Sequence, residues 1–155
     1  MQEFSTKERK REFDKIFKEK MVPLFENHGF ERHTKSSKRI FKALGEGLSV
    51  FIFFEYKSFG YGFYDMSIVY FDEEIGDVYD DIYLVMAQAK CPVISGKNAE
   101  ELNRSVEAWK MDMQTDIFPF IEAHTTHKAI LNATHFYFSK GREEQCRELL
   151  MRKAT

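Results

Sequence analysis

The feature that most constrains the fold is a 21-residue stretch, residues 51–71, in which ten residues are aromatic. It consists of two runs whose side chains alternate between two faces, joined by a Ser-Phe-Gly-Tyr-Gly segment. Glycines in a short connection between alternating β-branched and aromatic residues are typical of a β-hairpin. In the second run, Tyr64, Ile68 and Tyr70 share one face, whereas Asp65 lies on the other. The sequence therefore predicts an antiparallel hairpin at the centre of a sheet.

Length and composition indicate an ordinary globular protein. The chain has 155 residues, of which 43% are hydrophobic and 31% charged, so we expect residues 1–155 to form a single domain with a hydrophobic core. The N-terminus lacks the apolar core of a signal peptide, and no stretch approaches the roughly 20 apolar residues that span a bilayer. The two cysteines, Cys91 and Cys146, lie in unlike contexts and are expected to be free thiols. These features favour a cytoplasmic protein without membrane contact.

The charges are distributed unevenly along the chain. Residues 1–42 hold twelve Lys or Arg against seven Asp or Glu, whereas residues 58–89 hold seven acids and no Lys or Arg. The formal net charge is −2, which argues against general nucleic-acid binding because that usually requires a basic excess. A partner protein would therefore meet opposite signs of charge at different parts of the surface.

The first part of the chain predicts one helix followed by strands. Residues 5–28 have apolar side chains at helical spacing; Ser5 or Thr6 could cap this helix, and Pro23 should kink it or begin a short second helix. Gly29 can end it in the left-handed conformation. Three or four strands follow, with the short polar segment 30–34 at an edge and the others over residues 38–44, 48–57 and 61–71.

The second part of the chain predicts mainly helices. Residues 82–86 could be a last strand or a short buried helix. Asn98 caps a clear amphipathic helix, which Pro119 bends or ends. A further helical segment is expected over residues 126–138 and a last helix after Gly141. The predicted fold class is α+β, an antiparallel meander of four to five strands with the N-terminal helix and the C-terminal helices packed against it.

A set of apolar, aromatic, glycine and proline positions along most of the chain forms a pattern that can be compared with known families. They are the early helix with Phe13, Ile16 and Pro23, the Gly29-Phe30 pair, Phe41, the strand end Phe54-Glu55-Tyr56-Lys57-Ser58, Phe63, Trp109 and Pro119-Phe120. In this arrangement the chain resembles the bacterial domain of unknown function 4304 family, although that family often has glutamine where Glu55 stands. The resemblance implies an antiparallel sheet packed against helices and brings no established chemistry. Some members are associated with bacterial conflict systems as toxin-neutralising partners.

The acidic run that follows the hairpin is the first candidate site. Its carboxylates are Asp72, Glu73, Asp77, Asp80 and Asp81. Their spacing does not follow the calcium-loop pattern, and a solvated acidic loop is the simplest interpretation. The functional interpretation is a docking surface for a basic partner protein, because complementary charge speeds association. Exposed tyrosines near the hairpin turn, Tyr61 and Tyr64, would add aromatic contacts to such an interface.

Two further groups of residues are candidates. His124 and His127 are three residues apart and could share a metal if a third ligand came from elsewhere, but exposed or capping histidines are the simpler interpretation. On the hairpin, Glu55 and Asp65 should come close together and could form a ligand pocket with Arg39 and Tyr56, or do acid–base chemistry. An exposed polar sheet face explains the same pattern.

No motif assigns catalytic residues. There is no G-x-S-x-G elbow and no phosphate-binding glycine loop. We therefore expect a non-enzymatic bacterial interaction module, immunity-like in role, that binds another protein through the acidic run or an aromatic sheet surface, with no cofactor and no metal. The alternative is a small-ligand-binding or hydrolytic domain using the carboxylates of the hairpin. A homodimer formed through exposed aromatic residues is a third possibility.

Overall fold

The expected hairpin forms the centre of the computed structural model, which describes residues 3–60 and 62–154. Strand β3 (Leu48–Lys57) pairs with β4 (Phe63–Asp72) in an antiparallel register without a break, from Leu48 opposite Asp72 to Lys57 opposite Phe63. Strand β2 (Arg39–Gly45) pairs with the other edge of β3. The two residues that join β2 to β3 are Glu46 and Gly47, with φ angles of 55° and 81°. Positive φ at both central residues is characteristic of a type I′ turn, whose twist suits a two-residue hairpin.

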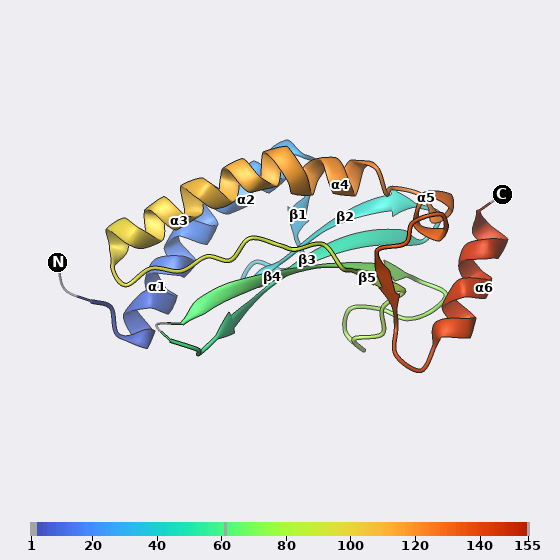
Figure 1. The fold of residues 1–155 in the computed structure, drawn as a ribbon, viewed down its shortest axis with the longest axis horizontal. Coiled ribbons are helices and arrows are strands. Elements are labelled where there is room, and N and C mark those ends of the chain that lie inside the picture. Colours follow the sequence, from blue (N-terminus) through green and yellow to red (C-terminus); the bar gives the residue numbers. More distant parts are fainter. Residues whose placement is uncertain (1–2, 61, 155) are drawn as a thin grey trace.

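Six strands form one sheet, in which each strand pairs antiparallel with the next one along the chain (Figure 1). The predicted meander is confirmed, and the number of strands is slightly higher than the predicted four to five. Strand β1 (Glu31–Arg32) lies at one edge, as expected from its short polar sequence. The other side of the sheet ends in two strands of three residues each, β5 (Val85–Ala87) and β6 (Phe136–Phe138).

The prediction of one helical segment over residues 126–138 is wrong for its second half. Helix α5 (His127–Leu131) begins after Thr126, whose hydroxyl accepts a hydrogen bond from the backbone N–H of Ala129. Residues 136–138 form β6 because they pair with β5, with Phe136 opposite Ala87. This pairing joins segments that are distant in sequence, so the local pattern does not reveal it.

Two long helical segments cover one face of the sheet, and each contains a π-helical turn immediately before a proline-bearing helix. The first comprises α1 (Thr6–Ile16), η1 (Phe17–Met21) and α2 (Val22–Asn27); the second comprises α3 (Ala99–Asp112), η2 (Met113–Ile117) and α4 (Phe118–Glu122). Proline lacks an N–H and crowds the carbonyl four residues earlier. The wider turns accommodate Pro23 and Pro119, with the N–H of Val22 donating to Phe17 and that of Phe118 donating to Met113. The helical path therefore continues past each proline.

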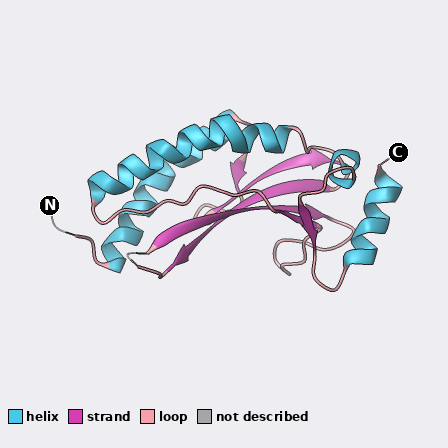
Figure 2. Ribbon diagram, viewed as in Figure 1, coloured by secondary structure: helices cyan, strands magenta, loops and turns pink. Residues whose placement is uncertain are grey.

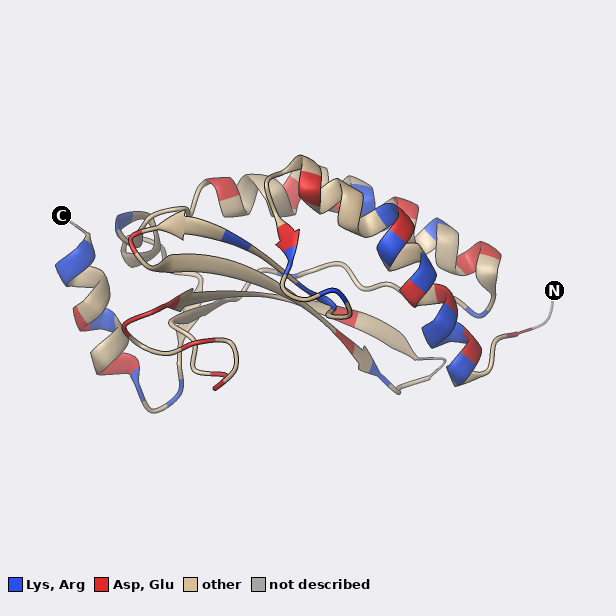
Figure 3. Cartoon of the chain, turned by 180° about the vertical axis from the view of Figure 1, so that it is seen from behind, with Lys and Arg blue, Asp and Glu red and all other residues tan. Residues whose placement is uncertain are grey.

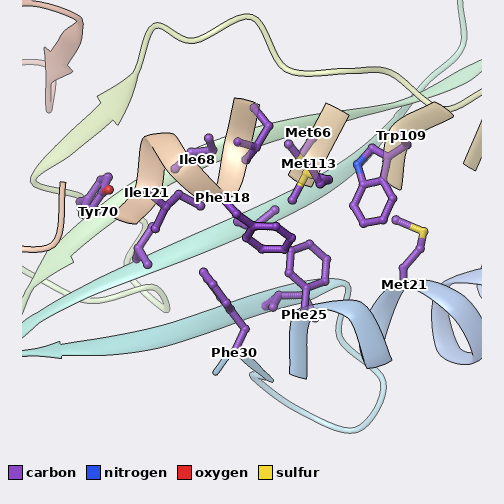
Figure 4. Packing of buried hydrophobic residues seen from close by; sticks show 14 of the residues in the cluster. Met21, Phe25, Phe30, Met66, Ile68, Tyr70, Trp109, Met113, Phe118 and Ile121 are labelled. Carbon is purple, nitrogen blue, oxygen red and sulfur yellow. The ribbon is translucent and has the colours of Figure 1, made fainter. Parts of the chain in front are cut away.

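The main core lies between these segments and the sheet (Figures 1 and 2). Figure 4 shows Trp109 and Phe118 of the second segment facing Met21 and Phe25 of the first, beside the sheet residues Met66, Ile68 and Tyr70. The Phe25 ring lies 5.6 Å from Trp109 and 5.9 Å from Phe118. Burial of these large side chains is the main stabilising contribution to the fold.

A smaller cluster lies on the opposite face of the sheet. It consists of Phe51, Val69, Phe71 and Val78, and Val78 belongs to the loop between β4 and β5. The helices lie on the other face (Figure 2), so this loop is what covers the aromatic residues here. Helix α6 (Glu143–Lys153) stands at the end of the sheet (Figure 1). No helix within the described ranges is long and apolar enough to cross a membrane.

Candidate functional site

A groove of about 460 Å³ lies between the loop that follows β4 and the end of the β2–β3 hairpin. We call it the acidic–aromatic groove. Its lining includes His33, Gly47, Phe51, Phe71, Glu73, Asp77, Val78 and Tyr79. The volume is in the range of small-ligand pockets, and the groove joins residues of the β1–β2 connection, three strands and the acidic run.

Aromatic rings form the floor and one wall of the groove. The centroids of Phe51 and Phe71 are 5.1 Å apart, and His33 lies 5.4 Å from Phe51 and 5.2 Å from Tyr79. Phe51 and Phe71 are nearly buried, whereas Tyr79 is 77% exposed. The exposed ring of Tyr79 therefore offers an aromatic face to a guest beside a floor of buried rings.

Carboxylates form the rim of the groove. The side chain of Glu73 lies across Gly47, where an added Cβ would approach the Glu73 Cγ to 2.7 Å. The second carboxylate, Asp77, accepts a hydrogen bond from the backbone N–H of Asp80, which fixes the turn of the loop. No lysine or arginine is among the described residues that line the groove. The groove is therefore built from π faces and negative charge.

Four exposed acids of this loop form no ion pair within the described residues, whereas the fifth, Glu74, is bound by Arg152 and Lys153 of α6. Across residues 3–60 and 62–154, no ion pair involves Glu73, Asp77, Asp80 or Asp81. Figure 3 shows the acidic residues of this loop toward the end of the molecule where α6 also carries Lys and Arg, while Lys and Arg alternate with acids along α1 at the other end. At Glu73, Asp77, Asp80 and Asp81 the loop thus presents negative charge that no ion pair within the described residues neutralises.

Asp72, the residue that precedes this loop, is turned inward and is fully buried. Its Oδ2 lies 2.6 Å from His127 Nε2, and its Oδ1 accepts a hydrogen bond of 2.9 Å from the backbone N–H of Glu74. The ammonium of Lys153 donates to both carboxylate oxygens at 3.1 and 3.2 Å. This network ties the start of the acidic loop to α5 and α6, since His127 and Lys153 belong to those helices.

The Lys153 ammonium is saturated by protein acceptors. It also donates to the backbone carbonyl of Glu46 at 2.8 Å and to Glu74 Oε2 at 2.8 Å. Burial alone would lower the pKa of Lys153, but its hydrogen bonds to Glu74 and Asp72 outweigh that effect and raise it. In the same contact, hydrogen bonds from Lys153 and Arg152 lower the pKa of Glu74.

The same network determines which ring nitrogen of His127 carries the proton. A carboxylate only accepts hydrogen bonds, so the Nε2 of His127 carries the proton and Nδ1 holds the lone pair in the neutral ring. His127 lines a second cavity of about 440 Å³ together with Thr126, Lys128 and Glu46 of the β2–β3 turn. The hydroxyl of Thr126 accepts the backbone N–H of Ala129 and so caps α5. The geometry indicates an anchoring role for the network.

The structure divides the predicted partner-binding residues. Glu73 and Asp77 line the acidic–aromatic groove, and Asp80 and Asp81 are exposed further along the same loop. Asp72 is buried on the helix side of the sheet and is not part of that surface. Tyr64 is 4% exposed and stacks on Phe13 with centroids 3.6 Å apart, while Tyr61 lies outside the described residues.

The predicted ligand pocket on the hairpin is also divided. Glu55 and Asp65 are directly opposite each other in the β3–β4 register. Tyr56 lies on the other face, with its ring 5.3 Å from Tyr64, and Arg39 lies over the ring of Phe53. The side-chain period of two along a strand separates Tyr56 from Glu55, so these four residues do not share one face.

The histidines pair differently from the expected arrangement. His127 binds Asp72, whereas His124 contacts His135, with a distance of 3.1 Å between their Nε2 atoms. No cluster of three or more His, Cys, Asp or Glu with metal-binding geometry occurs in the described part of the chain. Cys91 and Cys146 are free, as expected.

Comparisons of the chain with protein-family models, curated proteins and solved structures found no match. The resemblance noted from the sequence therefore stays a prediction, and the function is argued from geometry and charge.

Proposed function

We propose that the chain is a non-catalytic interaction module that binds a basic segment of another protein by placing a lysine or arginine side chain in the acidic–aromatic groove. The observation that carries the proposal is the groove's composition: Glu73 and Asp77 line it together with the rings of Phe51, Phe71 and Tyr79, and none of the described lining residues is Lys or Arg. The free thiols Cys91 and Cys146 support a reducing, cytoplasmic location for this activity.

A cationic side chain fits this chemistry better than other guests. A lysine or arginine head group is attracted to aromatic faces, and this attraction grows when the contact is desolvated. The two carboxylates would supply charge-assisted hydrogen bonds, which are about twice as strong as neutral ones. An anionic guest would be repelled by Glu73 and Asp77, and a purely apolar guest would leave both carboxylates desolvated without a partner.

The surroundings of the groove favour a macromolecular partner. Asp80 and Asp81 continue the negative surface beyond the groove, so a segment with several basic residues would meet charge along the whole loop. Charge complementarity of this kind accelerates encounter and fixes orientation. The anchor formed by Asp72, His127 and Lys153 holds the start of the loop, so the groove is formed before the partner arrives.

The test is a fluorescence-polarisation titration with labelled peptides of equal length, one rich in Lys and Arg and one rich in Glu and Asp. The protein is compared with the double variant Glu73→Gln/Asp77→Asn. We expect the basic peptide to bind and the acidic peptide not to bind. The double variant should weaken binding by at least about tenfold, a loss of roughly 1.4 kcal/mol. Raising the salt concentration should weaken binding by the unchanged protein more than by the variant.

A matched control is the double variant Glu55→Gln/Asp65→Asn. It removes the same charge from the exposed Glu55 and the half-buried Asp65, which lie opposite each other outside the groove. Equal loss in both variants would mean that net charge alone attracts the peptide, and it would refute the groove as the site. Tight binding of free spermidine, with no preference for the peptide, would instead assign the groove to a small cationic ligand.

A further inference from the structure

His124 and His135 bring two imidazole nitrogens together at the end of the sheet. Their Nε2 atoms are 3.1 Å apart, and the rings are nearly perpendicular, at 86°. His124 follows α4 and His135 precedes β6, so the pair joins two elements that the sequence separates. Both residues are half-buried.

The protonation of His124 is fixed by a backbone carbonyl. Its Nδ1 lies 2.7 Å from the carbonyl oxygen of Phe120. A carbonyl can only accept, so Nδ1 carries the proton and Nε2 of neutral His124 holds a lone pair. A ring N–H donated to a backbone carbonyl is the usual way in which a metal-binding histidine is oriented.

We propose that His124 and His135 bind a divalent late transition metal, such as zinc, through their Nε2 atoms. With metal–nitrogen bonds of about 2.0–2.1 Å, two nitrogens 3.1 Å apart subtend an angle of about 98° at the metal. That angle lies between those of square and tetrahedral coordination. Zinc has no geometric preference from its d electrons, so it can accept the angle, and two or more positions stay open for water or a small ligand.

The arrangement of the rings agrees with a shared metal. The ring centroids are 4.9 Å apart. If both rings pointed straight at each other across the 3.1 Å between their Nε2 atoms, the distance between the centroids would be longer. The ring axes are therefore tilted away from the line between the two nitrogens, as bonds to one metal demand. Without metal, the Nε2–H of His135 donates to His124; metal binding requires that proton to move to Nδ1 of His135.

The surroundings would hold the two rings in place. Phe120 lies 4.6 Å from His124 and 5.3 Å from His135, and Phe136 lies 5.3 Å from each histidine ring. The backbone of His135 is fixed in turn, because its carbonyl accepts a hydrogen bond from the N–H of Gln88 at 2.9 Å. These contacts reduce the ordering that metal binding would otherwise require.

The experiment is a calorimetric titration of metal-free protein with zinc chloride at pH 7.5, repeated with two single variants. His135→Gln removes a metal ligand, but its amide N–H can still donate to His124, so the apo contact is preserved. The matched control, His33→Gln, removes a histidine that lies beside the carboxylates of the acidic–aromatic groove. We expect saturable binding of one zinc per chain, at least about tenfold weaker binding for His135→Gln, and unchanged binding for His33→Gln.

Residue-specific NMR completes the test. In two-bond ¹H–¹⁵N spectra, zinc should shift the Nε2 resonances of His124 and His135 and leave that of His127 unchanged. Lowering the pH should weaken binding, because protons compete for the same lone pairs. Absence of saturable binding, binding retained in His135→Gln, or shifts confined to other histidines would overturn the proposal.

Discussion

Replacing Asp72 with asparagine should produce one of the larger losses of stability available in this protein. The amide oxygen can still accept the N–H of Glu74, but the amide N–H₂ would face two donors, Nε2 of His127 and Nζ of Lys153. Hydrogen bonds to charged groups contribute about 1.5–3 kcal/mol each, so losing two gives about 3–6 kcal/mol. Lys153 keeps its bonds to Glu74 and Glu46 and its 3.2 Å bond to the oxygen at the Oδ1 position, so we expect the lower part of that range, about 3–4 kcal/mol.

Urea denaturation followed by circular dichroism would measure this loss, with the m-value checked for two-state behaviour. For a domain of this length, about 3–4 kcal/mol corresponds to a fall in Tm of roughly 6–16 °C. The control is Asp80→Asn, which neutralises an exposed acid of the same loop and should change stability by no more than about 0.5 kcal/mol. A loss below about 1 kcal/mol for Asp72→Asn would show that the buried network does not anchor the loop.

Two further predictions concern the β2–β3 turn and the half-buried thiol. Glu46 has a φ of 55° at the first central position of a type I′ turn, where asparagine is favoured. Glu46→Asn should therefore raise the free energy of unfolding, measured by urea denaturation, by about 0.5–1 kcal/mol. A lower free energy of unfolding would contradict backbone strain at Glu46. Burial, and secondly the charge of Asp65, raises the pKa of Cys91 to about 11 from 9.0. Only the thiolate reacts, so iodoacetamide should alkylate Cys91 about 100-fold more slowly at pH 8 than an ordinary thiol, with a rate that still rises tenfold per pH unit at pH 9.5. Peptide mapping by mass spectrometry separates Cys91 from Cys146, and a plateau near pH 9 would refute the shift.

The central hairpin and the two long helical segments could be predicted from the sequence because their information is local. Alternating aromatic residues specify β3 and β4, and the spacing of apolar residues together with a capping box at Ser5 and Glu8 specifies α1. The inward position of Asp72 was also encoded: extending the alternation of Tyr64, Ile68 and Tyr70 by one step places it on the helix-covered face. Because Asp72 carries the same charge as the acids that follow it, composition alone groups it with the exposed acidic run.

The partners of Asp72 could not be predicted in the same way. His127 is 55 residues away and Lys153 is 81 residues away, and nothing in either local sequence marks it as half of a buried pair. The contact between His124 and His135 depends on β6, which forms only because β5 offers an edge. The acidic–aromatic groove likewise combines the β1–β2 connection with the loop after β4, so it exists only in the folded chain.

The acidic run therefore has two roles that can be separated by experiment. Asp72 and Glu73 are adjacent, but the pleat of β4 sends the first toward the helices and leaves the second at the groove. Asp72→Asn should lower stability and weaken peptide binding only as far as the loop loosens, whereas Glu73→Gln/Asp77→Asn should weaken binding while the free energy of unfolding stays nearly constant. If both variants lowered stability and binding in proportion, the groove carboxylates would be structural, and the case for a cationic guest would fail.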